Sequence, residues 1–135
     1  LEQQQVAYSV ATEVGGGTSF SMLQTLSEAY KVTQMNGNKL SPLKSLYLAT
    51  LGNAKTLQLE DKIGSFKIGN EADFAVLDFN STPIMALKQA KCKTLAEKLF
   101  AMIILGDDRA VQATYVAGNC VHERDANIKI NAGEK

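Results

Sequence analysis

The sequence is poor in the side chains from which hydrolases most often build a metal site. Its only histidine is His122, whereas an ordinary catalytic zinc site takes two or three histidines and a carboxylate. Cys92 and Cys120 form neither a C-x-x-C pair nor a cysteine-rich framework. We therefore expect reduced, structural thiols in a cytoplasmic protein.

Net charge and long apolar runs are lacking as well. Lys and Arg balance Asp and Glu at 14 each, so the chain carries no electrostatic footprint for nucleic acid or an anionic membrane. The longest apolar run, residues 99–105, is about a third of the roughly 20 residues that span a bilayer. We expect neither nucleic acid nor membrane as a partner.

What is present indicates a packed domain or a piece of one. Apolar residues make up 45% of the 135, which is enough for a buried core. The chain begins Leu1-Glu2-Gln3, without Met and without a charged lead into an apolar stretch. We interpret this start as a cut through a longer protein.

The first half is predicted to be one strand followed by helices. Residues 6–14 are rich in Val and small residues, and three glycines end this strand. Thr18 or Ser19 can cap a helix that runs to about Asn36. Ser41-Pro42 is typical of the start of a second helix. The expected inward residues of that helix and of the short one after it are Leu43, Leu46, Tyr47, Ala54, Leu57 and Leu59.

The second half is predicted to hold short strands around further helices. Residues 73–79 favour a strand, and residues 84–90 a short helix. Thr94 and Glu97 form a capping box that opens a helix ending near Gly106. The next expected pieces are strands over 111–116 and 120–123, with a hairpin turn at 117–119 and a polar tail.

The order of elements indicates an α/β fold that is incomplete by itself. A strand followed by a helix belongs to a parallel sheet, and such a strand needs parallel neighbours. The sequence contains no strand before residue 6 to supply them. The last 70 or so residues could add strands to a small β-domain.

Glu13 is the first candidate functional residue. It ends the predicted first strand, where α/β folds gather their functional groups, so it could bind a metal or accept a proton. The structural alternative is a carboxylate that only interacts with the following helix N-terminus. The glycines at 15–17 could cradle an anion with their amides, but they lack the lysine and the spacing of a phosphate loop. A tight turn is the alternative.

The acidic pair before Arg109 and the single histidine can also be interpreted as structural rather than functional residues. Asp107 and Asp108 could share acid–base work, or they could end a helix and pair with Arg109. His122 is predicted to lie on the surface of the last hairpin. One histidine in that position assembles no Ser-His-Asp or Cys-His arrangement.

Three segments together resemble the guanine deaminases of the amidohydrolase superfamily. The middle one matches the superfamily in general, and the outer two narrow the match. The segments are residues 12–23 (TEVGGGTSFSML), residues 49–54 with 63–66 and 71–74 (ATLGNA, IGSF, EADF), and residues 105–109 with 115–119 (LGDDR, YVAGN). The resemblance covers roughly residues 6 to 124.

The resemblance implies the C-terminal part of a TIM-barrel-like metal-dependent hydrolase. Residues 1–60 would be the last barrel strand and the helices that follow it. Residues 61–124 would be the C-terminal strands of a small β-sandwich with an intervening helix, and residues 125–135 a polar tail. This order agrees with the elements predicted from the pattern of residues.

The resemblance also implies a reaction. Guanine deaminases use one zinc ion to activate the water that converts guanine to xanthine and ammonia. The family's histidine ligands, its proton-shuttling glutamate and most of its guanine contacts lie upstream of the segments matched here. We therefore expect zinc in the full-length enzyme and none bound by this chain alone.

One family site residue maps onto the chain. The aspartate that ends the eighth barrel strand and contacts the metal and its water corresponds to Glu13, which is thus the implied catalytic and metal-contacting residue. Glu adds a methylene that moves its oxygens outward by roughly 1.5 Å, and a misplacement of about 1 Å can cost on the order of a hundredfold in rate. Ser9 and Ala11 replace two nearby glycines of the family pattern.

Two other functions stay open from the sequence. The chain could be a non-catalytic binding or scaffolding module derived from an amidohydrolase, or part of a deaminase of another heterocycle. The barrel-facing apolar surface would be exposed in either a module or a fragment. Because such patches associate, we expect a homo-oligomer.

The purified 135-residue chain should form no xanthine from guanine, because its one histidine cannot complete a zinc site. The measurement is product formation followed by chromatography with zinc supplied. Xanthine above the level of a no-protein blank would contradict the expectation.

Overall fold

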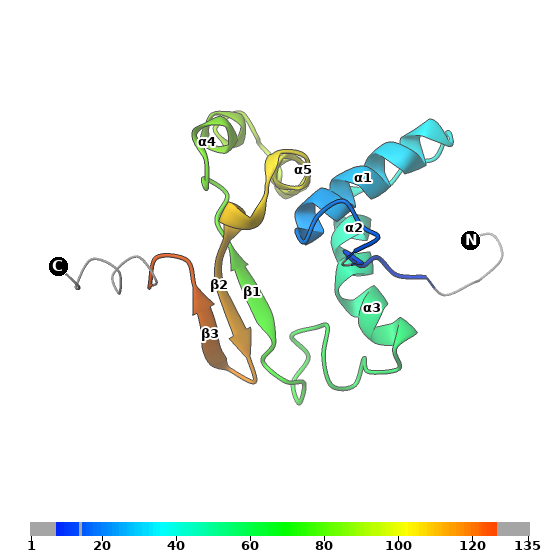
Figure 1. Cartoon of the computed structure of the whole chain (residues 1–135), viewed down its shortest axis with the longest axis vertical. Coiled ribbons are helices and arrows are strands. Elements are labelled where there is room, and N and C mark those ends of the chain that lie inside the picture. Colours follow the sequence, from blue (N-terminus) through cyan, green and yellow to red (C-terminus); the bar gives the residue numbers. More distant parts are fainter. Residues whose placement is uncertain (1–7, 14, 127–135) are drawn as a thin grey trace.

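The computed structural model describes residues 8–13 and 15–126. Figure 1 shows the helices of the N-terminal half on one side, the sheet on the other, and the helices of the second half at one end of the sheet. The elements in order are α1 Met22–Met35, α2 Pro42–Ala49, α3 Leu51–Thr56, β1 Phe74–Leu77, α4 Pro83–Gln89, α5 Leu95–Leu105, the short 3-10 helix η2 Asp108–Ala110, β2 Val111–Val116 and β3 Asn119–Glu123.

The sheet is antiparallel, with the strand order β1-β2-β3. Phe74 pairs with Tyr115 across β1 and β2, and their rings stack with centroids 4.5 Å apart. Ala117 and Gly118 turn the chain from β2 to β3 with φ of 48° and 78°. Positive φ at both central positions gives the turn a twist that matches the strands, as the predicted hairpin requires.

The core lies where α1, α4 and α5 meet the end of the sheet. Its buried members are Leu23, Met85, Met102 and Ala110, with Leu77 and Phe79 packed against them. Tyr30 of α1 also meets Phe100 of α5 edge to face, with ring centroids 5.0 Å apart. Helix α5 therefore connects the N-terminal helices to the sheet.

The predicted helix starts at Ser41 and Thr94 are confirmed. The Ser41 hydroxyl accepts a hydrogen bond from the Lys44 amide at 3.2 Å. The Thr94 hydroxyl accepts from the Glu97 amide at 3.2 Å, and the Glu97 carboxylate accepts in return from the amides of Lys93 and Thr94. These amide donors, Lys93 first, hold the pKa of Glu97 below its ordinary value.

The predicted first strand is absent from the part of it that the structure describes. Residues 8–13 form no strand, and Val6, Ala7 and Val14 lie outside the described residues. A strand exists only where a neighbour takes its backbone hydrogen bonds. Here the carbonyl oxygen of Val10 instead accepts from the side-chain amide of Asn53.

The helix predicted to start at Thr18 or Ser19 begins later, at Met22 with Ser21 as its N-cap. The Ser19 hydroxyl accepts from the amide of Ser21, so it stabilises the turn before the helix rather than the helix itself. Two leucines expected inside, Leu43 and Leu57, are 59% and 66% exposed. The expected burial of Ala54 is confirmed. Helices α2 and α3 also bury Ser45, Leu48 and Gly52, which were not predicted.

None of the helices in the described ranges is long and apolar enough to span a bilayer.

Replacing Thr94 by alanine should lower the free energy of unfolding by about 1 kcal/mol, because the capping acceptor is lost. Thr94→Ser keeps the hydroxyl and serves as the control, with an expected change of less than about 0.5 kcal/mol. Urea unfolding of both variants measures the difference. Equal stability of Thr94→Ala and the unmodified protein would contradict the role of the capping box.

Candidate functional site

Glu13 occupies an uncommon backbone conformation. Its φ is 50°, in the left-handed region that few residues other than glycine adopt. Its carbonyl oxygen accepts hydrogen bonds from the amides of Gly16 at 3.2 Å and Gly17 at 2.6 Å. The side chain is exposed. A strained residue held by its surroundings is a common feature of functional sites.

The glycines after Glu13 are required by the shape of this turn. Gly15 has a φ of 98°, and a Cβ on Gly17 would overlap the carbonyl oxygen of Thr12. A Cβ on Gly16 would lie 3.1 Å from Oε1 of Glu13, so the carboxylate lies over this glycine. Because two of the turn amides already bind the Glu13 carbonyl, the tight-turn interpretation is favoured over an anion site.

Helix α3 contacts the segment that leads into Glu13. The side-chain Nδ2 of Asn53 donates to the carbonyl oxygen of Val10 at 3.0 Å. Figure 1 shows this segment, in blue, beside the helices α2 and α3. Asn53 belongs to the middle of the three segments that resemble guanine deaminases. That segment therefore contacts the backbone of the candidate site, and the sequence spacing alone does not reveal this contact.

Residues 71–73 of the same segment form hydrogen bonds with the loop after α3 and with the β2–β3 hairpin. The Glu71 amide donates to the carbonyl oxygen of Lys62 at 2.7 Å. The Asp73 carboxylate accepts from the amide of Ala117 at 2.7 Å, and the Gly118 amide donates to Ala72. Asp73 thus stabilises the β2–β3 turn and has a structural task.

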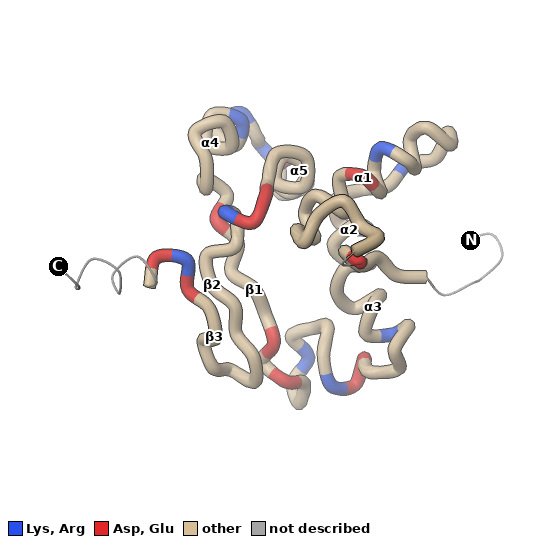
Figure 2. Tube along the Cα trace, viewed as in Figure 1, with Lys and Arg blue, Asp and Glu red and all other residues tan. Residues whose placement is uncertain are grey.

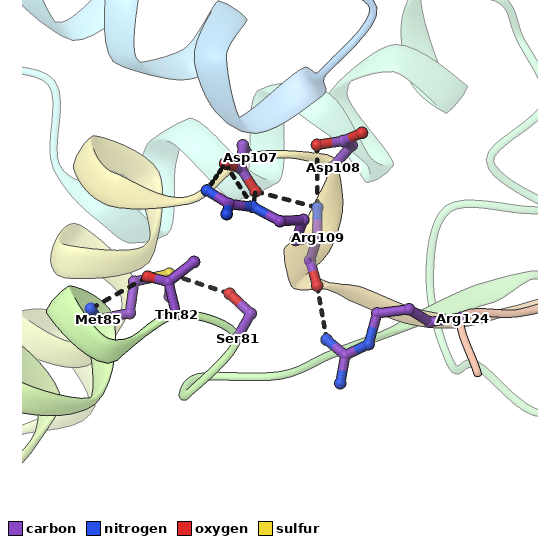
Figure 3. Close-up of polar contacts among 7 residues, drawn as sticks. All are labelled: Ser81, Thr82, Met85, Asp107, Asp108, Arg109 and Arg124. Atoms are coloured by element: carbon purple, nitrogen blue, oxygen red, sulfur yellow. Dashed lines mark hydrogen bonds and ion pairs between the residues drawn. The ribbon is translucent and has the colours of Figure 1, made fainter. Parts of the chain in front are cut away.

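The predicted pairing of Asp107 with Arg109 is confirmed. Both guanidinium Nε and Nη2 donate to the Asp107 carboxylate, with the shortest distance 2.6 Å, as Figure 3 shows. The guanidinium holds the pKa of Asp107 below its ordinary value, and the carboxylate in turn raises the pKa of Arg109. Figure 2 shows this corner as adjoining acidic and basic segments between α5 and β2. A carboxylate engaged in this way is poorly suited to acid–base work.

A second arginine extends this cluster to the sheet. Arg124 donates through Nη1 to the carbonyl oxygen of Arg109 at 2.6 Å and through Nη2 to Asp78 at 3.0 Å. The amide of Asn80 and then Arg124 lower the pKa of Asp78. Asp78 and Arg124 are 46 positions apart, so no local sequence signal could pair them.

The cap of α4 lies near this cluster. Figure 3 shows the Thr82 hydroxyl accepting from the Met85 amide and the Ser81 hydroxyl donating to the Met85 sulfur. Met85 is fully buried in the core. Met85 shares its buried core cluster with Ala110, which directly follows Arg109 in the chain.

The predicted surface position of His122 is confirmed, since the side chain is exposed on β3. Within the described residues, no three His, Cys, Asp or Glu side chains are grouped so that they could hold a metal ion. Glu13 is therefore not part of a group of three potential metal ligands within the described ranges.

Residues 1–121 match the model of the Amidohydrolase family. The chain belongs to this family. Its α/β content and small antiparallel sheet are those of an amidohydrolase fragment. The resemblance predicted from the sequence is confirmed at this level.

The most similar relatives include guanine deaminases. The guanine deaminase of Escherichia coli K12 is 50% identical over 123 residues, which are 91% of this chain and 28% of the relative. The probable guanine deaminase of Deinococcus radiodurans is 35% identical over 124 residues, with 90% and 28% covered. The chain thus spans little more than a quarter of these relatives.

Solved structures give the same result. The E. coli guanine deaminase superposes with a TM-score of 0.88 at 50% identity, over 90% of this amidohydrolase chain and 29% of that structure. The guanine deaminase of Bradyrhizobium japonicum superposes with a TM-score of 0.84 at 35% identity, over 90% and 32%. The described fold is therefore close to the matching part of these enzymes.

Arg124→Gln should lower the free energy of unfolding at pH 7 by about 1 kcal/mol, because two hydrogen bonds are lost. The lowered pKa of Asp78 stabilises the native protein above the ordinary value of 3.8, and that contribution disappears as the pH falls through the folded value. The difference between the unmodified protein and Arg124→Gln should therefore narrow below pH 3.8.

Urea unfolding at several pH values measures this difference. Lys67→Gln is the matched control, since it removes only an exposed ion pair with Asp61 at 3.7 Å. We expect it to change stability by less than about 0.5 kcal/mol at any pH. A difference for Arg124→Gln that is independent of pH would contradict the role assigned to Asp78.

Proposed function

We propose that this chain contributes to a zinc-dependent guanine deaminase, which hydrolyses guanine to xanthine and ammonia. The observation that carries the proposal is the 50% identity to the E. coli guanine deaminase together with a TM-score of 0.88. Likeness at this level extends over 90% of the chain.

Within this proposal Glu13 supplies a carboxylate to the metal site. Zinc accepts carboxylate oxygens as well as histidine nitrogens, and the exposed Glu13 side chain can supply such an oxygen. The described residues hold no group of three such ligands, so the remaining ligands would come from elsewhere in the protein. When bound, zinc lowers the pKa of a coordinated water so that hydroxide is available near neutral pH.

The turn prepares Glu13 for this task. Its carbonyl oxygen binds two glycine amides, and its carboxylate lies over Gly16. Fixing the backbone next to a ligand limits its motion and orients its oxygens. A carboxylate oriented in this way can hold an attacking water by hydrogen bonding or accept a proton from it.

The finer architecture belongs to the same proposal. Residues 1–60 would provide the last barrel strand and its helices, residues 61–124 the C-terminal share of a β-sandwich, and residues 125–135 a tail. Phe66 and Ile68 are 87% and 100% exposed, and such side chains suit contact with the rest of an enzyme. Homo-oligomer formation and a cytoplasmic location complete the proposal.

Glu13→Asp in the intact protein should raise kcat/KM for guanine or zinc retention, on the order of tenfold or more. The shorter side chain returns the carboxylate oxygens to the position that the family's aspartate gives them. Glu13→Ala should lower kcat by on the order of a hundredfold, since a ligand is lost. Steady-state assays on guanine, adenine and cytosine, with metal analysis, measure both effects and the substrate.

Glu28→Asp is the control, because this exposed glutamate of α1 pairs only with Lys31 in the described contacts. It should leave kcat, KM and zinc content unchanged. Full activity of Glu13→Ala would contradict the assignment of Glu13. Deamination of adenine or cytosine in preference to guanine would contradict the proposed substrate.

A further inference from the structure

We propose that Asn53 is a positioning residue for Glu13. Its side-chain amide would fix the backbone segment that carries the carboxylate, without contacting substrate or metal itself. This inference rests on the proposed function for its catalytic consequence. Its structural part, that Asn53 holds the Glu13 turn in place, can be tested separately.

The contact joins two segments that are far apart in the chain. Nδ2 of Asn53 lies 3.0 Å from the carbonyl oxygen of Val10, across 43 positions, and the pair is partly buried. Val10 precedes Glu13 by three residues. A hydrogen bond to the backbone, unlike one to a flexible side chain, sets the path of the segment directly.

Asn53 itself has little freedom to move, because small residues lie on both sides of it. A Cβ on Gly52 would come within 2.8 Å of the carbonyl oxygen of Tyr47, which shows how closely α3 approaches α2. On the other side, a Cβ on Gly64 would come within 2.7 Å of the Ala54 Cβ. The side-chain amide of Asn53 is thus carried by a backbone that packs tightly at Gly52 and at Ala54.

The restraint continues from Val10 to the carboxylate. Thr12 and Gly17 approach so closely that only glycine fits at residue 17. The Glu13 carbonyl oxygen binds the amides of Gly16 and Gly17. A shift at Val10 would therefore be passed through three residues to Glu13, and a displacement of about 1 Å can cost on the order of a hundredfold in rate.

The test is Asn53→Asp in the intact protein. The side chain keeps its shape, but the donor becomes a carboxylate oxygen that repels the Val10 carbonyl. We expect kcat for guanine and the apparent zinc affinity to fall by tenfold to a hundredfold, as is typical when a supporting residue is lost. KM should stay within about twofold, because Asn53 is not proposed to touch guanine.

Asn70→Asp is the matched control. Asn70 also uses its side-chain amide, which donates to the Glu60 carbonyl oxygen at 3.4 Å and to the Ser65 hydroxyl at 3.2 Å. These contacts stabilise the loop after α3 and not the Glu13 segment. The control should change thermal stability by an amount similar to Asn53→Asp while leaving kcat and zinc affinity unchanged.

Hydrogen–deuterium exchange reads the positioning itself, independently of activity. Peptides covering the amides of Gly16 and Gly17 should exchange at least severalfold faster in Asn53→Asp and at the unmodified rate in Asn70→Asp. If the intact protein without a substitution forms no xanthine, the proposed function fails, and this comparison still decides the role of Asn53. Unchanged exchange would overturn the inference, as would faster exchange in Asn53→Asp with kcat unchanged in an active enzyme.

Discussion

The described structure depends above all on the packing of α5. Its buried residues Ala101, Met102 and Ile103 lie between the N-terminal helices and the end of the sheet, and it contacts α1, α2 and α4. Gly106, which follows the helix, allows the approach of Leu23 from α1, because a Cβ there would lie 2.9 Å from a Leu23 methyl carbon. The helices that hold the Glu13 turn are thereby tied to the sheet.

Polar contacts then fix what this apolar packing leaves free. Asp73 holds the β2–β3 turn, Arg124 ties Asp78 to the start of β2, and Asn53 ties α3 to the segment before Glu13. Each of these side chains bonds at least one backbone group far away in the chain. Such bonds define positions more sharply than hydrophobic contact, which has no direction.

The sequence predicted those features whose causes are local. The capping box at Thr94, the start of α2 at Ser41 and the hairpin at Ala117 each depend on residues within a few positions. The inward faces of α2 and α3 were predicted only in part. Ala54 is buried as expected, whereas Leu43 and Leu57 obey the helical period but are exposed, because the neighbouring elements bury other residues. The strand before Glu13 required pairing partners that periodicity cannot supply.

The candidate site was predictable only through resemblance. From its position in the sequence alone, Glu13 could be either a metal ligand or a carboxylate that interacts with the next helix N-terminus. Its left-handed backbone conformation follows from the turn that Gly15 to Gly17 make. The Asn53 contact could not be foreseen, because its partner is a backbone carbonyl 43 positions away. Family membership, in contrast, rests on a match over residues 1–121.

The central claim is that Glu13 belongs to a metal site, and a zinc-bound crystal structure of the intact protein tests it most directly. The account predicts a Glu13 carboxylate oxygen within about 2.0–2.2 Å of zinc, or within hydrogen-bonding distance, about 2.5–3.0 Å, of a zinc-bound water. A fully coordinated zinc ion with the Glu13 carboxylate turned away, in contact with neither the metal nor its water, would contradict it.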